Sequence, residues 1–196
     1  MLRMTHMLPA LLAVVAAPLL HAGGDEKSRD SAERRLHKIE TRAKKIPKPA
    51  DADEIPSFLL RETQRLIDQS RTFPHSSYKF DRTLEAVDDL LDAREDWTAA
   101  RQDREEDETR ADTVKRLERA YFRVQQGEYF AKLSQDRNAS EYVRRSRQLY
   151  QQARAAYDRR ELHRANKLAS ASSELVNVLE NLAQAAVRRP EPPVLK

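Results

Sequence analysis

A series of carboxylates in the middle of the chain is the densest group of side chains that could do chemistry. Five of them recur at spacings of three and four residues: Asp81, Glu85, Asp88, Asp92 and Glu95. This spacing places them along one side of a helix, where they could bind a divalent cation or a basic partner. The alternative is a solvated flank that pairs with arginines elsewhere in the chain, as charge runs on helices commonly do. No calcium-loop motif accompanies the series, so we predict an acidic face and no metal site.

Tyrosines and arginines are interleaved in the C-terminal half and form a second candidate surface. Its members are Tyr121, Tyr129, Tyr142, Arg144, Arg145, Tyr150 and Arg154. Aromatic rings and guanidinium groups bind anionic ligands or partner proteins through stacking and cation–π contacts. The alternative is a helical core, which is the more frequent role of aromatic side chains at helical spacing.

No motif of a known type of catalysis or cofactor binding is present. The sequence has no cysteine, which excludes thiolate metal sites, disulfides and Cys nucleophiles. His37, His75 and His163 do not have the spacing of a zinc-binding helix or of a carboxylate-bridged metal bundle. We therefore predict no cofactor, no bound metal and no enzymatic activity.

The N-terminus has the features of a signal peptide, predicted over residues 1–24. Arg3 precedes a short apolar stretch at residues 8–20, and small residues follow. Cleavage after Ala22 and cleavage after Gly24 both fit this pattern. The apolar stretch contains two prolines and is too short for a comfortable membrane span. We expect an exported protein, periplasmic or secreted, with no membrane span after cleavage.

The remaining chain predicts an all-α fold without a sheet. Apolar residues make up 39% and charged residues 35%, which suits helices with narrow apolar stripes and wide solvated faces. We expect five to six helices, arranged as antiparallel hairpins in an elongated bundle. The predicted segments are a charged arm with a proline-containing linker (25–56), a helical hairpin (57–100), a charged connector (101–112), a C-terminal helical bundle (113–187) and a proline-rich tail (188–196).

Several local expectations follow from the apolar periodicity. Ser57 is a good N-cap for the first helix of the hairpin, and the second helix should begin near Tyr78. A further helix should begin near Thr113, and Gly127 should mark a kink or a tight turn in it. The pattern leaves open whether the charged arm is a helix or partly disordered, and whether 101–112 is helix or loop.

Charge is segregated along the chain. Residues 81–112 carry 13 acidic and 5 basic side chains, whereas 113–196 carry 17 basic and 9 acidic. This invites pairing between the acidic middle and the basic C-terminal half. Acidic residues dilute the basic clusters, so we expect no nucleic-acid binding. The combined features favour an exported scaffolding or binding protein of the cell envelope, acting on an envelope protein or by self-association. The alternative is a periplasmic helical bundle that binds a small ligand or a metal as a sensor or carrier.

Overall fold

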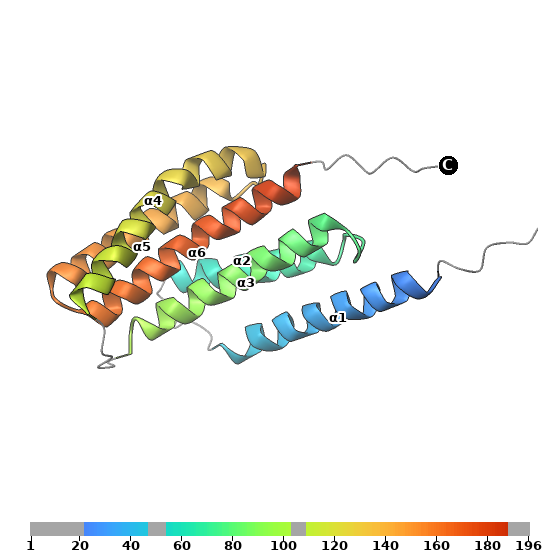
Figure 1. Ribbon diagram of the computed structural model, residues 1–196, viewed down its shortest axis with the longest axis horizontal. Helices are drawn as coiled ribbons and strands as arrows, with labels where there is room; N and C mark the ends of the chain where they lie inside the picture. The colour runs from blue at the N-terminus through green and yellow to red at the C-terminus, as the bar shows by residue number, and fades with distance from the viewer. Residues whose placement is uncertain (1–21, 47–53, 103–108, 188–196) are drawn as a thin grey trace, which may run out of the picture.

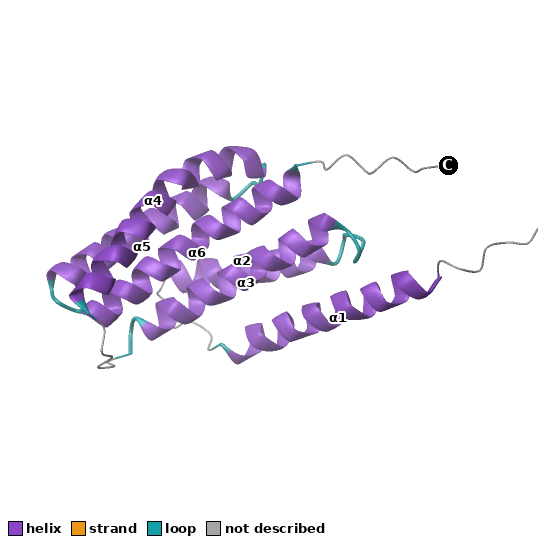
Figure 2. Ribbon diagram, in the orientation of Figure 1, coloured by secondary structure: helices purple, strands orange, loops and turns teal. Residues whose placement is uncertain are grey.

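The protein is a bundle of six helices, with no strand among the residues that its computed structural model describes, which are 22–46, 54–102 and 109–187 (Figures 1 and 2). The all-α bundle expected from the sequence is therefore confirmed. The helices are α1 (Ala22–Lys45), α2 (Glu54–Ser70), α3 (Tyr78–Ala99), α4 (Arg110–Ser134), α5 (Ala139–Asp158) and α6 (Leu162–Ala186).

Helix α6 is the centre of the fold and packs against α3, α4 and α5 (Figure 1). It buries residues around much of its circumference, including Leu175, Val176 and Leu179, each 0% exposed. A helix that must face three neighbours needs an apolar surface wider than a single stripe. The predicted hairpin and the predicted C-terminal bundle meet here, because α3 and α6 share one hydrophobic core.

Small residues let the C-terminal helices approach closely. Ser146 of α5 and Ser172 of α6 exchange hydrogen bonds, each hydroxyl donating to the other residue's carbonyl oxygen at 2.8 Å. Gly127 lies buried within the continuous helix α4, so the tight turn that the sequence left possible is absent. A Cβ atom at Gly127 would lie 3.6 Å from Val176 Cγ2 and 3.7 Å from Val143 Cγ2. Gly127 thus continues the buried stripe of α4 at its contact with α5 and α6.

In the α2–α3 hairpin, the predicted start of α3 is confirmed, whereas the predicted start of α2 is wrong. The Ser77 hydroxyl caps α3 by accepting a hydrogen bond from the Phe80 amide at 3.1 Å. Helix α2 begins at Glu54, however, and not after Ser57. Pro56 is tolerated there because amides in the first turn have no intrahelical acceptor to lose. Ile55 and Pro56 are buried as a result.

Helix α4 also begins earlier than expected, at Arg110. The Thr109 hydroxyl caps it by accepting a hydrogen bond from the Asp112 amide at 3.1 Å. Residues 103–108 of the predicted connector lie outside the described residues, as do the predicted signal peptide up to residue 21, residues 47–53 of the linker and the tail from residue 188.

The charged arm forms helix α1, which runs beside α3 and α2 at the edge of the bundle (Figure 1). Among the side chains described in this segment, few apolar ones are buried: Ala32, Ile39 and Ile46 just after the end of the helix. None of the described helices is long and apolar enough to cross a membrane.

Candidate functional site

The outward surface of α4 carries most of the large apolar side chains that the described residues expose. Phe122 is 66% exposed, Tyr129 63% and Leu133 41%. Spacings of seven and four residues put these three on one side of the helix, opposite the buried Leu117, Val124 and Gly127. We call the surface formed by Glu118, Phe122, Gln125, Tyr129, Lys132 and Leu133 the outer face of α4. Exposed apolar patches of this kind commonly mark protein-binding surfaces.

The aromatic rings of this region hold one another in place. The Tyr121 and Phe122 ring centroids lie 5.8 Å apart, and those of Tyr129 and Phe130 lie 5.6 Å apart, both pairs edge to face. Tyr121 also contacts Tyr150 of α5, with centroids 5.9 Å apart. Pairs with this geometry contribute about 0.5–1.5 kcal/mol beyond the burial of their area, which favours the observed arrangement of the exposed rings.

The seven tyrosines and arginines that the sequence singled out do not form one surface. Tyr142 is 0% exposed and lies in the core, where its ring meets Phe58 of α2 edge to face at 5.1 Å. Arg145 is also buried, whereas Arg144 and Arg154 are exposed on α5. Tyr121 and Tyr150 are in contact, and Tyr129 lies two helical turns further along α4.

Arg145 and Arg144 are both engaged with carboxylates. Arg145 binds Glu141 and Glu54, each at 2.8 Å, and thereby connects α5 to the start of α2. Arg144 donates hydrogen bonds from two nitrogen atoms to the Glu141 carboxylate, at 2.6 and 2.8 Å. The hydrogen bonds from Arg144, reinforced by Arg145, lower the pKa of Glu141 to about 2, although burial opposes them. These arginines are therefore already occupied by the protein's own carboxylates.

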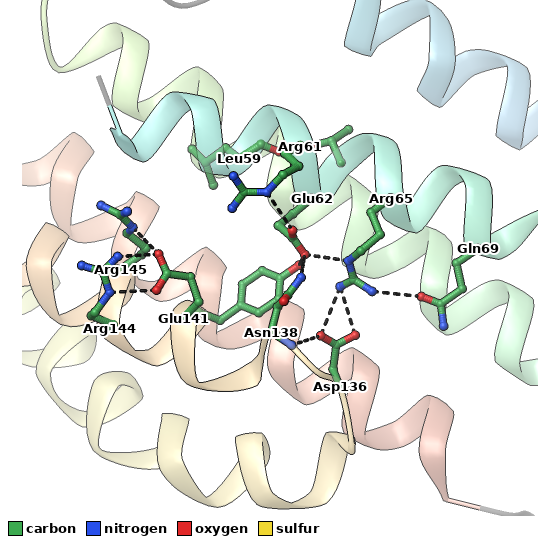
Figure 3. A network of polar contacts seen from close by, with 12 residues as sticks. Leu59, Arg61, Glu62, Arg65, Gln69, Asp136, Asn138, Glu141, Arg144 and Arg145 are labelled. Carbon is green, nitrogen blue, oxygen red and sulfur yellow. Dashed lines mark hydrogen bonds and ion pairs between the residues drawn. The ribbon is translucent and has the colours of Figure 1, made fainter. Parts of the chain in front are cut away.

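A buried polar cluster joins α2 to the α4–α5 turn (Figure 3). At its centre is Glu62, only 1% exposed. Its Oε2 atom accepts hydrogen bonds from Arg65 Nε at 2.7 Å, Asn138 Nδ2 at 2.8 Å and the Tyr142 hydroxyl at 3.2 Å. Arg65 in turn binds both carboxylate oxygens of Asp136, at 3.0 and 3.2 Å. We call these five residues the Glu62 cluster.

The electrostatics of the Glu62 cluster favour the charged carboxylate. Burial alone would raise the pKa of Glu62, but the hydrogen bonds from Asn138 and Arg65 outweigh it, and the pKa is lowered. Burial, and then the nearby Glu62 charge, raise the pKa of Tyr142 well above its usual value. Tyr142 is therefore a neutral hydrogen-bond donor. Because each polar side chain of the cluster already has hydrogen-bond partners within it, we assign the cluster a structural role, which is to hold α2 against α5.

The predicted acidic face lies against α1. Arg42 of α1 reaches Asp92 and, at 2.8 Å, Glu95; it is also 3.7 Å from Asp88. Arg35, two helical turns earlier, lies 3.7 Å from Asp81 and 3.9 Å from Asp88. We call this set of contacts the α1–α3 seam. The main partners of the acidic face are thus arginines of the N-terminal arm, and not those of the C-terminal half as the charge distribution suggested.

The remaining acidic residues of α3 point elsewhere. Glu85 pairs with Arg82 of its own helix. On the flank toward α6, Asp96 lies 3.5 Å from Lys167 and Asp89 accepts a hydrogen bond from Asn181 at 2.8 Å. Burial, with Glu174 and Asp92 nearby, raises the pKa of Asp89 to about 7 despite that hydrogen bond. No group of three His, Asp or Glu side chains in the described ranges is placed to hold a metal ion.

An open groove runs between α4 and α5. Its charged lining consists of Glu128, Lys132, Asp136, Arg137, Arg144 and Arg147. Arg147 is paired with Glu128 across the groove at 2.6 Å, and Arg144 with Glu141. Lys132 and Arg137 are left as the cations available to an incoming anion.

Sequence reasoning missed two of the residues that make the outer face of α4 apolar, Phe122 and Leu133. The spacing of the apolar residues Val114, Leu117, Tyr121 and Val124 predicts a buried stripe that continues after Gly127 through Tyr129, Phe130 and Leu133. In the structure the buried stripe continues through Ala120 and Gly127, which turns Tyr129 and Leu133 outward. The small residues Ala120 and Gly127 are seven residues apart and therefore lie on the same side of the helix. Their spacing could have predicted that this side packs closely on α6.

Comparison of the chain with protein-family models, with curated proteins and with solved structures gave no match.

Proposed function

We propose that the protein is an exported helical binding protein of the cell envelope that acts through protein–protein contacts. The outer face of α4 is its binding surface. The observation that carries this proposal is the concentration of exposed Phe122, Tyr129 and Leu133 on one side of one helix. Leaving such side chains in water forgoes the gain of burying them, and aromatic anchors are the residues that dominate binding energies at protein interfaces. The signal-peptide features of residues 1–24 support export.

Site-specific photocross-linking in the envelope tests the surface. A photoreactive phenylalanine analogue at position 122 should give cross-linked protein adducts, while the same analogue at Gln152, an exposed residue of α5, should give none. The mass of the recovered chain tests export, since cleavage after Ala22 or Gly24 shortens it. Equal adduct yields from the two positions, or none from position 122, would contradict the assignment of the surface.

A second candidate function is the binding of a small anion in the groove between α4 and α5. Lys132 and Arg137 favour it, because both cations line the groove and neither is paired with a carboxylate of the described chain. A thermal-shift series with inorganic phosphate tests it. A ligand that binds the folded state must raise the melting temperature, and Arg137→Ala should abolish that rise.

A further inference from the structure

The outer face of α4 is organised symmetrically about Gln125. Phe122 and Tyr129 flank it at three and four residues. Glu118 and Lys132 each lie seven residues from it, on opposite sides along the helix. Fourteen residues are close to four helical turns, so Glu118 and Lys132 project from the same side of α4, about 21 Å apart along its axis.

Both of these charged side chains are exposed. Neither forms an ion pair with any other residue that the structure describes, in contrast to Arg123 on the inner flank, which binds Glu180 at 2.7 Å. The outer face therefore combines exposed aromatic rings with the unpaired Glu118 toward one end and the unpaired Lys132 at the other. Lys115, which is exposed and also has no ion pair among the described residues, lies one turn before Glu118.

We propose that this face binds the same face of a second copy of the chain, with the two α4 helices antiparallel. The inference rests on the proposed function and names the partner. A two-fold axis through the centre of the face, perpendicular to the helices, brings Glu118 of each copy opposite Lys132 of the other. It also brings Phe122 of each copy beside Tyr129 of the other.

The interface of a symmetric dimer must be self-complementary, because the same surface patch of each copy contacts that patch of the other copy. When two identical helices pair antiparallel, a residue on one side of the first helix meets a residue on the same side of the second. Glu118 and Lys132 lie on the same side of α4 and carry opposite charges, so each can face the other residue in the second copy. A parallel pair would instead place Glu118 against Glu118 and Lys132 against Lys132, which is repulsive. The opposite charges of Glu118 and Lys132 therefore favour a second copy of the chain in the antiparallel direction.

Charge exchange between these two positions tests the proposal by sedimentation equilibrium on the full chain. The wild type should dimerise. Glu118→Lys and Lys132→Glu should each weaken the dimer by roughly tenfold or more in dissociation constant, because each change creates two like-charge contacts per dimer. The double variant Glu118→Lys/Lys132→Glu should dimerise as the wild type does.

A mixture of the two single variants, prepared by coexpression, tests whether opposite charges restore the contact between the copies; the direction is tested by the wild type and the single variants. In an antiparallel mixed pair, position 118 of the Glu118→Lys copy faces position 132 of the Lys132→Glu copy, and the two unchanged residues Lys132 and Glu118 face each other. Both contacts then join opposite charges, so dimerisation should return. Asp158→Lys, at the exposed end of α5, is the matched control and should leave the dimer unchanged. Circular dichroism verifies that each surface variant is folded.

The outcomes separate the inference from the proposed function. A wild type that stays monomeric, single variants that dimerise normally, or a mixture that stays monomeric would each overturn the antiparallel dimer. If cross-links from position 122 then join the chain to a different protein, the proposed binding surface stands without the dimer. If position 122 gives no cross-link at all, the proposed function fails as well.

Discussion

The Glu62 cluster and the α1–α3 seam use the same chemistry in opposite surroundings. Both join two helices through arginine and carboxylate groups. Glu62 is 1% exposed, and its guanidinium partner Arg65 is 17% exposed at the side chain. In the seam, the side chains of Asp92 and Glu95 are 49% and 48% exposed. The seam contains five ion pairs and the cluster two, so the number of pairs alone would make the seam the stronger connection.

Burial decides how much each region contributes to stability. Exposed ion pairs contribute about 0.2–1 kcal/mol, because water and salt screen them. A buried charge network is different, since removing one partner leaves the others without compensation, at a cost of about 3–5 kcal/mol. The Glu62 cluster should therefore hold α2 against α5 firmly, whereas α1 should be the most easily detached helix of the fold.

Replacing the central carboxylate is expected to have the largest effect. Glu62→Ala should lower the free energy of unfolding by about 3 kcal/mol or more, because Arg65, Asn138 and Tyr142 lose their common acceptor in a buried place. Urea denaturation followed by circular dichroism measures this loss. Glu85→Ala, which breaks the partly exposed pair with Arg82, is the matched control and should cost less than about 1 kcal/mol. Similar losses for both variants would remove the distinction between buried and exposed pairs.

Asp89 sharpens the comparison, because it is a partly buried carboxylate with an amide partner but no ion pair among the described side chains. Its pKa is raised to about 7, so the folded state binds its proton more tightly than the unfolded state does. The stabilising contribution of this proton is fully present below about pH 4 and is lost as the pH rises to about 7.

The variant Asp89→Asn removes that pH dependence. Relative to wild type, its free energy of unfolding should increase between about pH 4 and 7, by on the order of 3 kcal/mol in total and at most about 1.4 kcal/mol per pH unit. Urea denaturation at several pH values measures the difference. Asp158→Asn, at an exposed site, should show no such trend. A constant difference between Asp89→Asn and wild type across this range would contradict the assignment.

Whether a feature of this structure could be predicted from the sequence depends on how far apart in the sequence the interacting residues are. The beginning of α3 at Tyr78 follows from Ser77 and a repeating apolar face, which are local signals, and the structure confirms it. The Glu62 cluster joins residues 76 and 80 positions apart, and no local pattern distinguishes Glu62 from the solvated glutamates around it. Likewise, the acidic face was visible as a series, but Arg35 and Arg42 could be identified as its partners only once α1 was placed beside α3.

The smallest effect is expected in the α1–α3 seam. Arg42→Ala should lower the free energy of global unfolding by no more than about 0.5–1 kcal/mol, because α1 buries few apolar side chains against the bundle. Its main consequence should be local, since regions with few buried contacts open without unfolding the rest of the protein. Amide hydrogens of α1 between residues 32 and 41 should exchange faster in Arg42→Ala, while those of α6 keep their protection.

Salt provides the control for that prediction. Raising the ionic strength to about 1 M shortens the screening length to about 3 Å, so wild-type α1 should then exchange nearly as fast as α1 of Arg42→Ala. The Glu62 cluster should be much less sensitive to the same salt, because the side chains of Glu62 and Asp136 are only 1% and 6% exposed and buried pairs are screened much less. If salt leaves exchange in α1 unchanged, then Ala32, Ile39 and Ile46 hold the helix and the arginines contribute little, and the seam would resemble the buried cluster more than its exposure suggests.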